Sequence, residues 1–195
     1  MQEILDRVKN ILLHPKEEWG IIQHEHTSTR DLIVHYALPV AGVAALATFL
    51  GYGLFGINAE IVQIKGFDTG LILGINSLIT NIATIIAGAY AIDALAPSFG
   101  AEKDIEKSMQ LITYAYTPVM VGGILNIIPA ISALGTLFGL YSIALLYWGI
   151  LPLKKTPKSK HLTYLIISIA ILILINFVIG YFLNGLFGSP YQLPA

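Results

Sequence analysis

The residue of this sequence best placed to do chemistry is the single acid inside a predicted membrane span. Asp93 lies in an apolar stretch from Leu71 to Ala96, and an ionisable group at membrane depth is by default a candidate for proton or ion handling. Asp93 is also close to the end of that stretch, where a carboxylate reaches water or a basic loop residue such as Lys103 or Lys107. The sequence favours this second interpretation, in which Asp93 pairs or snorkels.

The second candidate is a polar path along the same stretch. Asn76, Thr80 and Thr84 share one face of a helix that turns about 100° per residue. Further along, Pro118 would free the carbonyl oxygen of Tyr114, a recurrent device in transporters. Hydrogen bonds between membrane helices use the same residue types and average about 0.6 kcal/mol, so helix packing is the favoured interpretation. The candidates for a polar path are Asn76, Thr80, Thr84, Asp93, Tyr114, Pro118 and Asn126.

Catalytic and metal-binding patterns are weak in this sequence. His24 and His26 flank Glu25, but no further histidine or cysteine is near in sequence, and a tetrahedral metal site needs about four ligands. The chain contains no cysteine, and no pattern supplies a nucleophile with a base or a phosphate-cradling glycine loop. We therefore expect no enzymatic activity, no cofactor and no metal site.

Basic and aromatic residues at the predicted membrane surface form a third set of candidates. A lysine or arginine near an anionic membrane surface contributes on the order of 1 kcal/mol to lipid binding, and indole rings prefer headgroup depth. The same lysines also enforce topology, and the sequence leaves both roles open. The candidates for headgroup contacts are Arg7, Lys9, Trp19, Lys154, Lys155, Lys158 and Lys160.

The elements that must position these residues are predicted to be membrane helices. Of the 195 residues, 55% are hydrophobic and 12% are charged, and the mean hydropathy is +0.73. An ordinary soluble domain carries about 25% charged residues. At about 20 residues per crossing, the chain has room for several spans but not for a separate soluble domain. We predict an all-α membrane protein, a compact five-helix transmembrane bundle with an N-terminal amphipathic interfacial helix.

The hydropathy pattern divides the chain into a leader, a membrane domain and a tail. Residues 1–30 form a cytoplasmic leader whose amphipathic helix either lies in the membrane interface or packs against the bundle. Residues 31–188 form the five-span domain, and residues 189–195 form a short tail outside. The turn at Pro129 bears no charge, so a re-entrant hairpin is an alternative to two full crossings there. The predicted spans are about 32–55, 71–96, 109–129, 133–152 and 162–187.

The basic residues predict the orientation of the chain in the membrane. Ten of the 11 lysines and arginines fall in the leader or in the two loops on its side of this map, and Lys65 alone falls on the other side. Because Lys and Arg are enriched in cytoplasmic loops, we predict a cytoplasmic N-terminus and an outside C-terminus.

Four short motifs follow one another in a distinctive order along the membrane domain. They are Tyr114-Ala-Tyr-Thr-Pro118, Ile128-Pro129, Gly149-Ile-Leu-Pro152 and Lys155-Thr-Pro157, with Pro15, Trp19 and Leu38-Pro39 before them. In this the chain resembles the Yip (Ypt-interacting protein) family, over nearly its whole length and in the short prokaryotic form. The resemblance implies five spans, a cytoplasmic N-terminus and the prokaryotic cytoplasmic membrane. Eukaryotic members are implied to bind Rab GTPases, but this chain lacks their long N-terminal region and its Asp-Leu-Tyr-Gly-Pro motif.

These observations favour a function in binding over one in catalysis. We predict a Yip-like multi-pass membrane protein that acts as a membrane scaffold or adaptor for membrane lipids or for a partner membrane or cytoplasmic protein. The alternative is a small channel or transporter for an ion or small solute. We expect no nucleic-acid partner, and a homo-oligomer is compatible with the sequence but not indicated by it.

Overall fold

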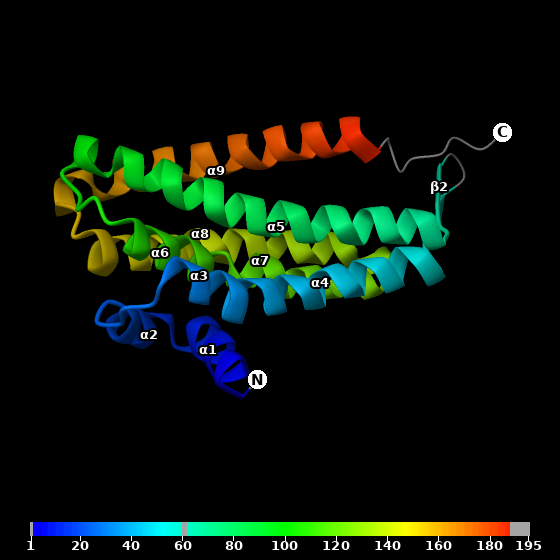
Figure 1. The fold of residues 1–195 in the computed structure, drawn as a ribbon, viewed down its shortest axis with the longest axis horizontal. Coiled ribbons are helices and arrows are strands. Elements are labelled where there is room, and N and C mark those ends of the chain that lie inside the picture. The colour runs from blue at the N-terminus through cyan, green and yellow to red at the C-terminus, as the bar shows by residue number, and fades with distance from the viewer. Residues whose placement is uncertain (1, 60–61, 188–195) are drawn as a thin grey trace.

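Long helices run side by side through the molecule, and their ends gather at two opposite ends of a bundle (Figure 1). The computed structural model describes residues 2–59 and 62–187, so the predicted tail at 189–195 lies outside the described residues. The elements are α1 (Gln2–Leu13), α2 (Pro15–Ile22), α3 (Thr29–Leu32), α4 (Leu38–Leu50), β1 (Ile57–Ala59), β2 (Val62–Ile64), α5 (Phe67–Leu95), α6 (Ile105–Ala115), α7 (Thr117–Gly122), α8 (Gly135–Lys154) and α9 (Lys158–Phe187). We call the end that carries α2 and the connections α5–α6 and α8–α9 the leader end, and the end that carries β1 and β2 the hairpin end (Figure 1).

Four helical segments are long and apolar enough to cross a membrane. They are Thr29–Phe55, Phe67–Phe99, Pro129–Lys154 and Lys158–Phe187. The predicted third span is instead built of consecutive pieces: α6, α7 and the 3-10 turn Gly123–Ile127. The all-α membrane bundle is thus confirmed, whereas the count of five helices is slightly off because one of the five segments is broken.

The break in the predicted third span, 109–129, lies beside Pro118; we call this span the broken segment. α6 ends at Ala115 and α7 begins at Thr117, with Pro118 in the first turn of the new helix. Proline has no N–H to donate and is tolerated at that position, whereas inside a continuous helix it would remove a hydrogen bond and clash with the preceding turn. Thr117 Oγ1 donates to the carbonyl oxygen of Thr113 at 3.3 Å, which satisfies one acceptor beside the break.

The 3-10 turn Gly123–Ile127, at the end of the predicted third span, reaches the hairpin end of the bundle. Asn126 Nδ2 donates to Thr48 Oγ1 at 2.9 Å, and a Cβ built on Gly51 would lie 1.9 Å from the backbone oxygen of Asn126. Thr48 and Gly51 belong to the far part of the segment Thr29–Phe55, next to β1. The predicted third and fourth spans, 109–129 and 133–152, therefore each run from one end of the bundle toward the other.

Glycines allow the segment Thr29–Phe55, which contains α4, to pack against α5 with their backbones in contact. A Cβ on Gly70 would lie 2.6 Å from the Cα of Gly53 and 2.6 Å from the carbonyl oxygen of Phe49. A Cβ on Gly74 would lie 3.0 Å from the carbonyl oxygen of Ala45. Small residues permit this approach, which is a main source of attraction between helices in lipid. We call this contact the glycine seam.

The strands β1 and β2 connect α4 to α5 at the hairpin end. They pair antiparallel, with Ile57 opposite Ile64. Gly56 and Gly66 flank the pair with φ values of 64° and 131°, a backbone region that glycine enters without the steric cost of a side chain. The chain thereby reverses direction and places α5 against α4.

The leader packs against the bundle. Ile11 of α1 and Trp19 and Ile22 of α2 are at most 1% exposed, and Tyr141 Oη of α8 donates to the carbonyl oxygen of Leu12 at 2.7 Å. The first helix therefore contacts the bundle through Ile11, while Leu5 and Leu13 remain exposed. Figure 1 places α1 alongside the helices and α2 at the leader end.

Candidate functional site

Trp19 anchors the leader to the bundle. Its buried indole meets the ring of Tyr114 edge-on, with 6.4 Å between ring centroids. Gly149 of α8 makes room for it, because a Cβ at that position would lie 2.8 Å from two carbons of the indole ring. The ring of Tyr36 also packs edge-on against Tyr114, with 5.0 Å between ring centroids. The hydroxyl groups of Tyr36 and Thr117 share a hydrogen bond of 2.9 Å.

Arg7 ties α1 to α2 and to the residues that follow α2. Its guanidinium pairs with Glu18 and with Glu25, the second pair at 2.5 Å, and it lies over the ring of Tyr114, 5.5 Å from the centroid. Burial disfavours the charge, but the hydrogen bond to Glu25 and the nearby acidic groups raise the pKa of Arg7 above its ordinary value. A charged arginine shared by two carboxylates and an aromatic face holds the leader in one place.

Lys107 of α6 binds the C-terminal end of α2. Its Nζ donates to the carbonyl oxygens of Gln23 at 3.0 Å and of Glu25 at 2.6 Å. Carbonyl groups at the end of a helix have no partner within the helix and carry partial negative charge, which a lysine satisfies. We call Arg7, Glu18, Trp19, Lys107 and Tyr114 together the leader clamp.

A second polar cluster joins α5, α6 and α8 beneath the leader end. Lys154 Nζ donates to Asp93 Oδ1 at 3.0 Å, to Ser108 Oγ at 2.6 Å and to the carbonyl oxygen of Asp104 at 3.1 Å. Asp93 Oδ1 also accepts from Ser108 Oγ at 2.9 Å and from the backbone N–H of Asp104 at 2.8 Å. Lys154 is 0% exposed. An ammonium group has three donors, and all three are used here.

The two clusters have the chemistry of structural latches. A buried ion pair is tolerated when further hydrogen bonds stabilise both ions. Here Lys154 Nζ uses all three donors, and Asp93 Oδ1 accepts three hydrogen bonds. Within residues 2–59 and 62–187, no group of three or more His, Cys, Asp or Glu residues is placed to hold a metal ion. The arrangement therefore fixes helices relative to one another and leaves outward-facing residues of the leader available for binding.

The residues predicted to form a polar path do not lie along one route. Asp93 pairs at the leader end, Tyr114 packs in the leader clamp, Pro118 starts α7, and Asn126 bonds Thr48 near the hairpin end. The remaining three are on α5. Thr84 bonds Asn176 on α9 at 3.3 Å, Asn76 and Thr80 are half-buried, and the buried Oδ1 of Asn76 has no partner among the described residues. Asp93 therefore forms an ion pair with a lysine, as the preferred interpretation expected, but the lysine is Lys154 instead of Lys103 or Lys107.

The residues predicted to contact lipid headgroups divide into an inward and an outward set. The prediction is wrong for Trp19 and Lys154, because both side chains are buried inside the protein. Arg7 turns toward Glu18, Glu25 and Tyr114. The outward set is exposed and consists of Lys9, Lys155, which pairs with Glu102 at 3.0 Å, Lys158 and Lys160.

Several residues of the two clusters were not singled out from the sequence. Glu18 and Glu25 bind Arg7, and Ser108 completes the Asp93 cluster. Asp104 caps α6 by accepting from the backbone N–H of Lys107 at 3.0 Å. The cap was the one recognisable signal, since an aspartate before an apolar helix is typical of an N-cap. The others depend on contacts between distant segments.

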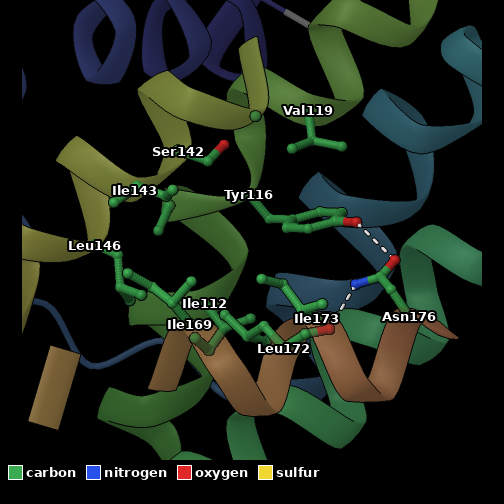
Figure 2. A pocket seen from close by; sticks show the side chains of 12 residues that line it. Ile112, Tyr116, Val119, Ser142, Ile143, Leu146, Ile169, Leu172, Ile173 and Asn176 are labelled. Atoms are coloured by element: carbon green, nitrogen blue, oxygen red, sulfur yellow. Dashed lines mark hydrogen bonds between the residues drawn. The ribbon is translucent and has the colours of Figure 1, made fainter. Parts of the chain in front are cut away.

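A third polar group lies deeper in the bundle. Tyr116 Oη and Thr84 Oγ1 both donate to Asn176 Oδ1 at 3.3 Å, and Asn176 Nδ2 donates to the carbonyl oxygen of Leu172 at 2.9 Å. Figure 2 shows Tyr116 and Asn176 at one side of an apolar pocket, with the Tyr116–Asn176 and Asn176–Leu172 bonds drawn as dashed lines. The group links α5, the broken segment and α9 through polar side chains that use one another as partners.

Comparison with known proteins identifies relatives over almost the whole chain. A family model described as the Yip1 domain matches residues 9–180. The chain is 24% identical over 195 residues to the inner membrane protein YohC of Escherichia coli strain K12, covering 97% of this chain and 100% of the relative. The protein of the same name from E. coli O6:H1 matches with the same identity and coverage. No solved structure matches the chain.

Proposed function

The chain belongs to the Yip1 domain family and is a multi-pass membrane protein, and from that premise we propose that it acts as a membrane scaffold or adaptor. The leader, held on the bundle, presents a surface to a partner protein or to the membrane. This role requires a leader with a fixed position, and the leader clamp supplies one.

The observation that carries the proposal is the burial of Trp19 in the leader clamp. A leader attached only by a flexible linker would lose conformational freedom on binding a partner, whereas a leader already in place avoids much of that cost. Burying a large apolar side chain contributes roughly 1.5–3 kcal/mol, and Ile11, Trp19 and Ile22 are all buried. The exposed charged residues of α1 and α2 then form the surface offered to a partner: Glu3, Asp6, Lys9, Lys16 and Glu17.

The proposed orientation places the leader end in the cytoplasm. Lys103 and Lys155 lie in the connections at that end, Lys158 and Lys160 lie in the first turn of α9, and Lys65 lies at the opposite end beside β2. Positive charge favours the cytoplasmic side of a membrane. The partner is accordingly a cytoplasmic protein, or the cytoplasmic part of a membrane protein.

Site-specific photo-crosslinking in native membranes tests the proposal. A photoreactive amino acid at Lys16 or at Glu17 of the full chain is expected to capture the same protein, and one at Asp68 near the hairpin end is not. The Gly149→Ala variant should lower the yield because its Cβ displaces Trp19. The Gly42→Ala variant is the matched control, since a Cβ at Gly42 meets nothing within 4 Å.

Two results would count against the scaffold. One is capture that is equally strong from Lys16 and from Asp68, or that Gly149→Ala leaves unchanged. The other is ion or solute flux through purified protein in liposomes that Asn76→Leu abolishes while the protein stays folded, which would support the transporter alternative through the α5 face.

A further inference from the structure

An apolar cavity of about 260 Å³ lies between the broken segment, α8 and α9 (Figure 2). Its walls are mainly branched aliphatic side chains. They include Ile112, Val119, Ile143, Leu146, Ile169 and Ile173. Apolar cavities of roughly 150 Å³ in proteins are large enough to bind benzene and stay free of water. This cavity is therefore suited to hydrocarbon.

The cavity lies where α9 packs against α5 and is separated from α8. At the leader end α8 and α9 are joined, with His161 stacked on Tyr147 at 4.6 Å between centroids. Further along, α9 contacts α5, since a Cβ on Gly88 would lie 2.5 Å from the side chain of Leu172 and Asn176 bonds Thr84. Ile143 and Ile173 line the cavity and are 37% and 65% exposed. The cavity thus opens at the side of two candidate membrane spans, where the surrounding solvent is lipid.

The polar groups beside the cavity leave little for a polar occupant to bind. Tyr116 Oη donates to Asn176 Oδ1, and Asn176 Nδ2 donates to the carbonyl oxygen of Leu172. Ser142 Oγ has no partner among the described residues, and a buried water needs two to four polar partners. A hydrocarbon chain is the occupant that fits these walls.

A lysine at the leader end indicates the headgroup to which this hydrocarbon chain belongs. Lys160 lies on the opposite face of α9, about 180° from Ile169, and its Nζ donates to the carbonyl oxygen of Ser98 at 3.4 Å. Lys158 is exposed, and at about 100° per residue it lies within about 20° of Ile169 on the surface of α9. The two positions are about 16 Å apart along the helix, which is close to half of a hydrocarbon core roughly 30 Å thick. A lipid with its headgroup at Lys158 therefore reaches the cavity with its tail, and lysines near the surface favour an anionic headgroup.

We propose that the cavity between α8 and α9 holds an acyl chain of an anionic phospholipid whose phosphate lies at Lys158. The site is separate from the leader surface. It does not require the scaffold role, and the scaffold role does not require it.

Photolabelling of the full chain in nanodiscs tests the lipid site. The probe is phosphatidylglycerol with a photoreactive group in its acyl chain, compared with the same probe on phosphatidylcholine. Labelling is expected on the α8 and α9 residues that line the cavity, with phosphatidylglycerol favoured. Lys158→Ala should lower that preference about fivefold. The matched control Lys160→Ala, on the opposite face of α9, should lower it much less.

A cavity-filling variant gives the second arm of the test. Gly139 lines the cavity, and a Cβ there meets nothing within 4 Å, so Gly139→Leu should fill the space and remove most of the labelling. Gly180→Leu on α9 is the control, since that position is equally open and does not line the cavity. The mapped labelling of the unaltered chain decides the question even if Gly139→Leu fails to fold. Label spread over the outer face of α9, or equal labelling by both probes, would overturn the proposal.

Discussion

At the leader end of the bundle charged side chains are buried and hydrogen-bonded, whereas along the glycine seam the contacts are between backbones. Lys154 uses all three of its donors on Asp93, Asp104 and Ser108. The seam brings Gly70 and Gly53 together with no polar side chain at the contact. The first arrangement depends on exact partners, and the second depends on the absence of side-chain atoms. In this membrane protein, helix positions are thus set by specific polar partners at the leader end and by close backbone packing along the glycine seam.

The largest expected effect comes from breaking the polar cluster at the leader end. Lys154→Ala leaves Asp93 buried without its cation, which costs about 3–5 kcal/mol in comparable cases. The thermal unfolding midpoint in detergent should fall steeply. The double variant Asp93→Asn with Lys154→Met should recover much of the loss, because uncharged side chains can replace a buried ion pair. A double variant no more stable than the single one would contradict a latch role for the pair.

The next effect comes from the glycine seam. Gly70→Ala places a Cβ 2.6 Å from backbone atoms of Gly53 and Phe49, and overpacking of this kind costs about 1–3 kcal/mol or more. The same thermal measurement applies, with Gly42→Ala on α4 as the control because that position is open. Equal unfolding midpoints for the two variants would contradict a backbone contact at Gly70.

A smaller effect is expected where the neighbour is a side chain. The Cβ of Gly149→Ala would lie 2.7 Å from Cδ1 of Leu111 and 2.8 Å from the indole of Trp19. Because both neighbours are side chains that can move, the cost should lie at the low end of about 1–3 kcal/mol. The expected change is exposure of Trp19, seen as a red shift of its fluorescence in a Trp148→Phe background. An unshifted spectrum in a folded variant would contradict the anchoring of the leader by Trp19.

The smallest effect belongs to the polar group inside the membrane. Asn176→Leu removes its bonds to Thr84 and Tyr116, and hydrogen bonds between membrane helices average about 0.6 kcal/mol. The unfolding midpoint should move by a few degrees at most. A loss as large as that of Lys154→Ala would remove the distinction between the two regions.

The sequence was most informative about helices and least about partners. Hydropathy predicted the four long helices, and the position of Asp93 near the end of its span predicted that it would pair or snorkel. They did not identify Lys154, which is 61 residues away along the chain and at the end of a helix. Trp19 was assigned to headgroups because indole rings prefer that depth in general. The space that receives it is created by Gly149, and only the packing of α8 against the leader reveals that.

The broken third segment shows a similar limit. Its apolar composition predicted a span, and Pro118 predicted a bend. The separation into α6 and α7, and the 3-10 turns near Pro129, depend on how this segment packs against α4. Local propensity marks the site of such a break, but tertiary contacts decide its extent.

The central claim is that the leader holds a fixed position on the bundle, and a distance between α2 and α6 tests it most directly. The chain contains no cysteine, so Glu17→Cys and Glu106→Cys, both at exposed positions, can carry spin labels in the full chain in lipid nanodiscs. We predict a single narrow distance distribution that broadens in the Gly149→Ala background and stays narrow in the Gly42→Ala background. A broad distribution in the otherwise unaltered chain, or one that Gly149→Ala does not change, would contradict the account.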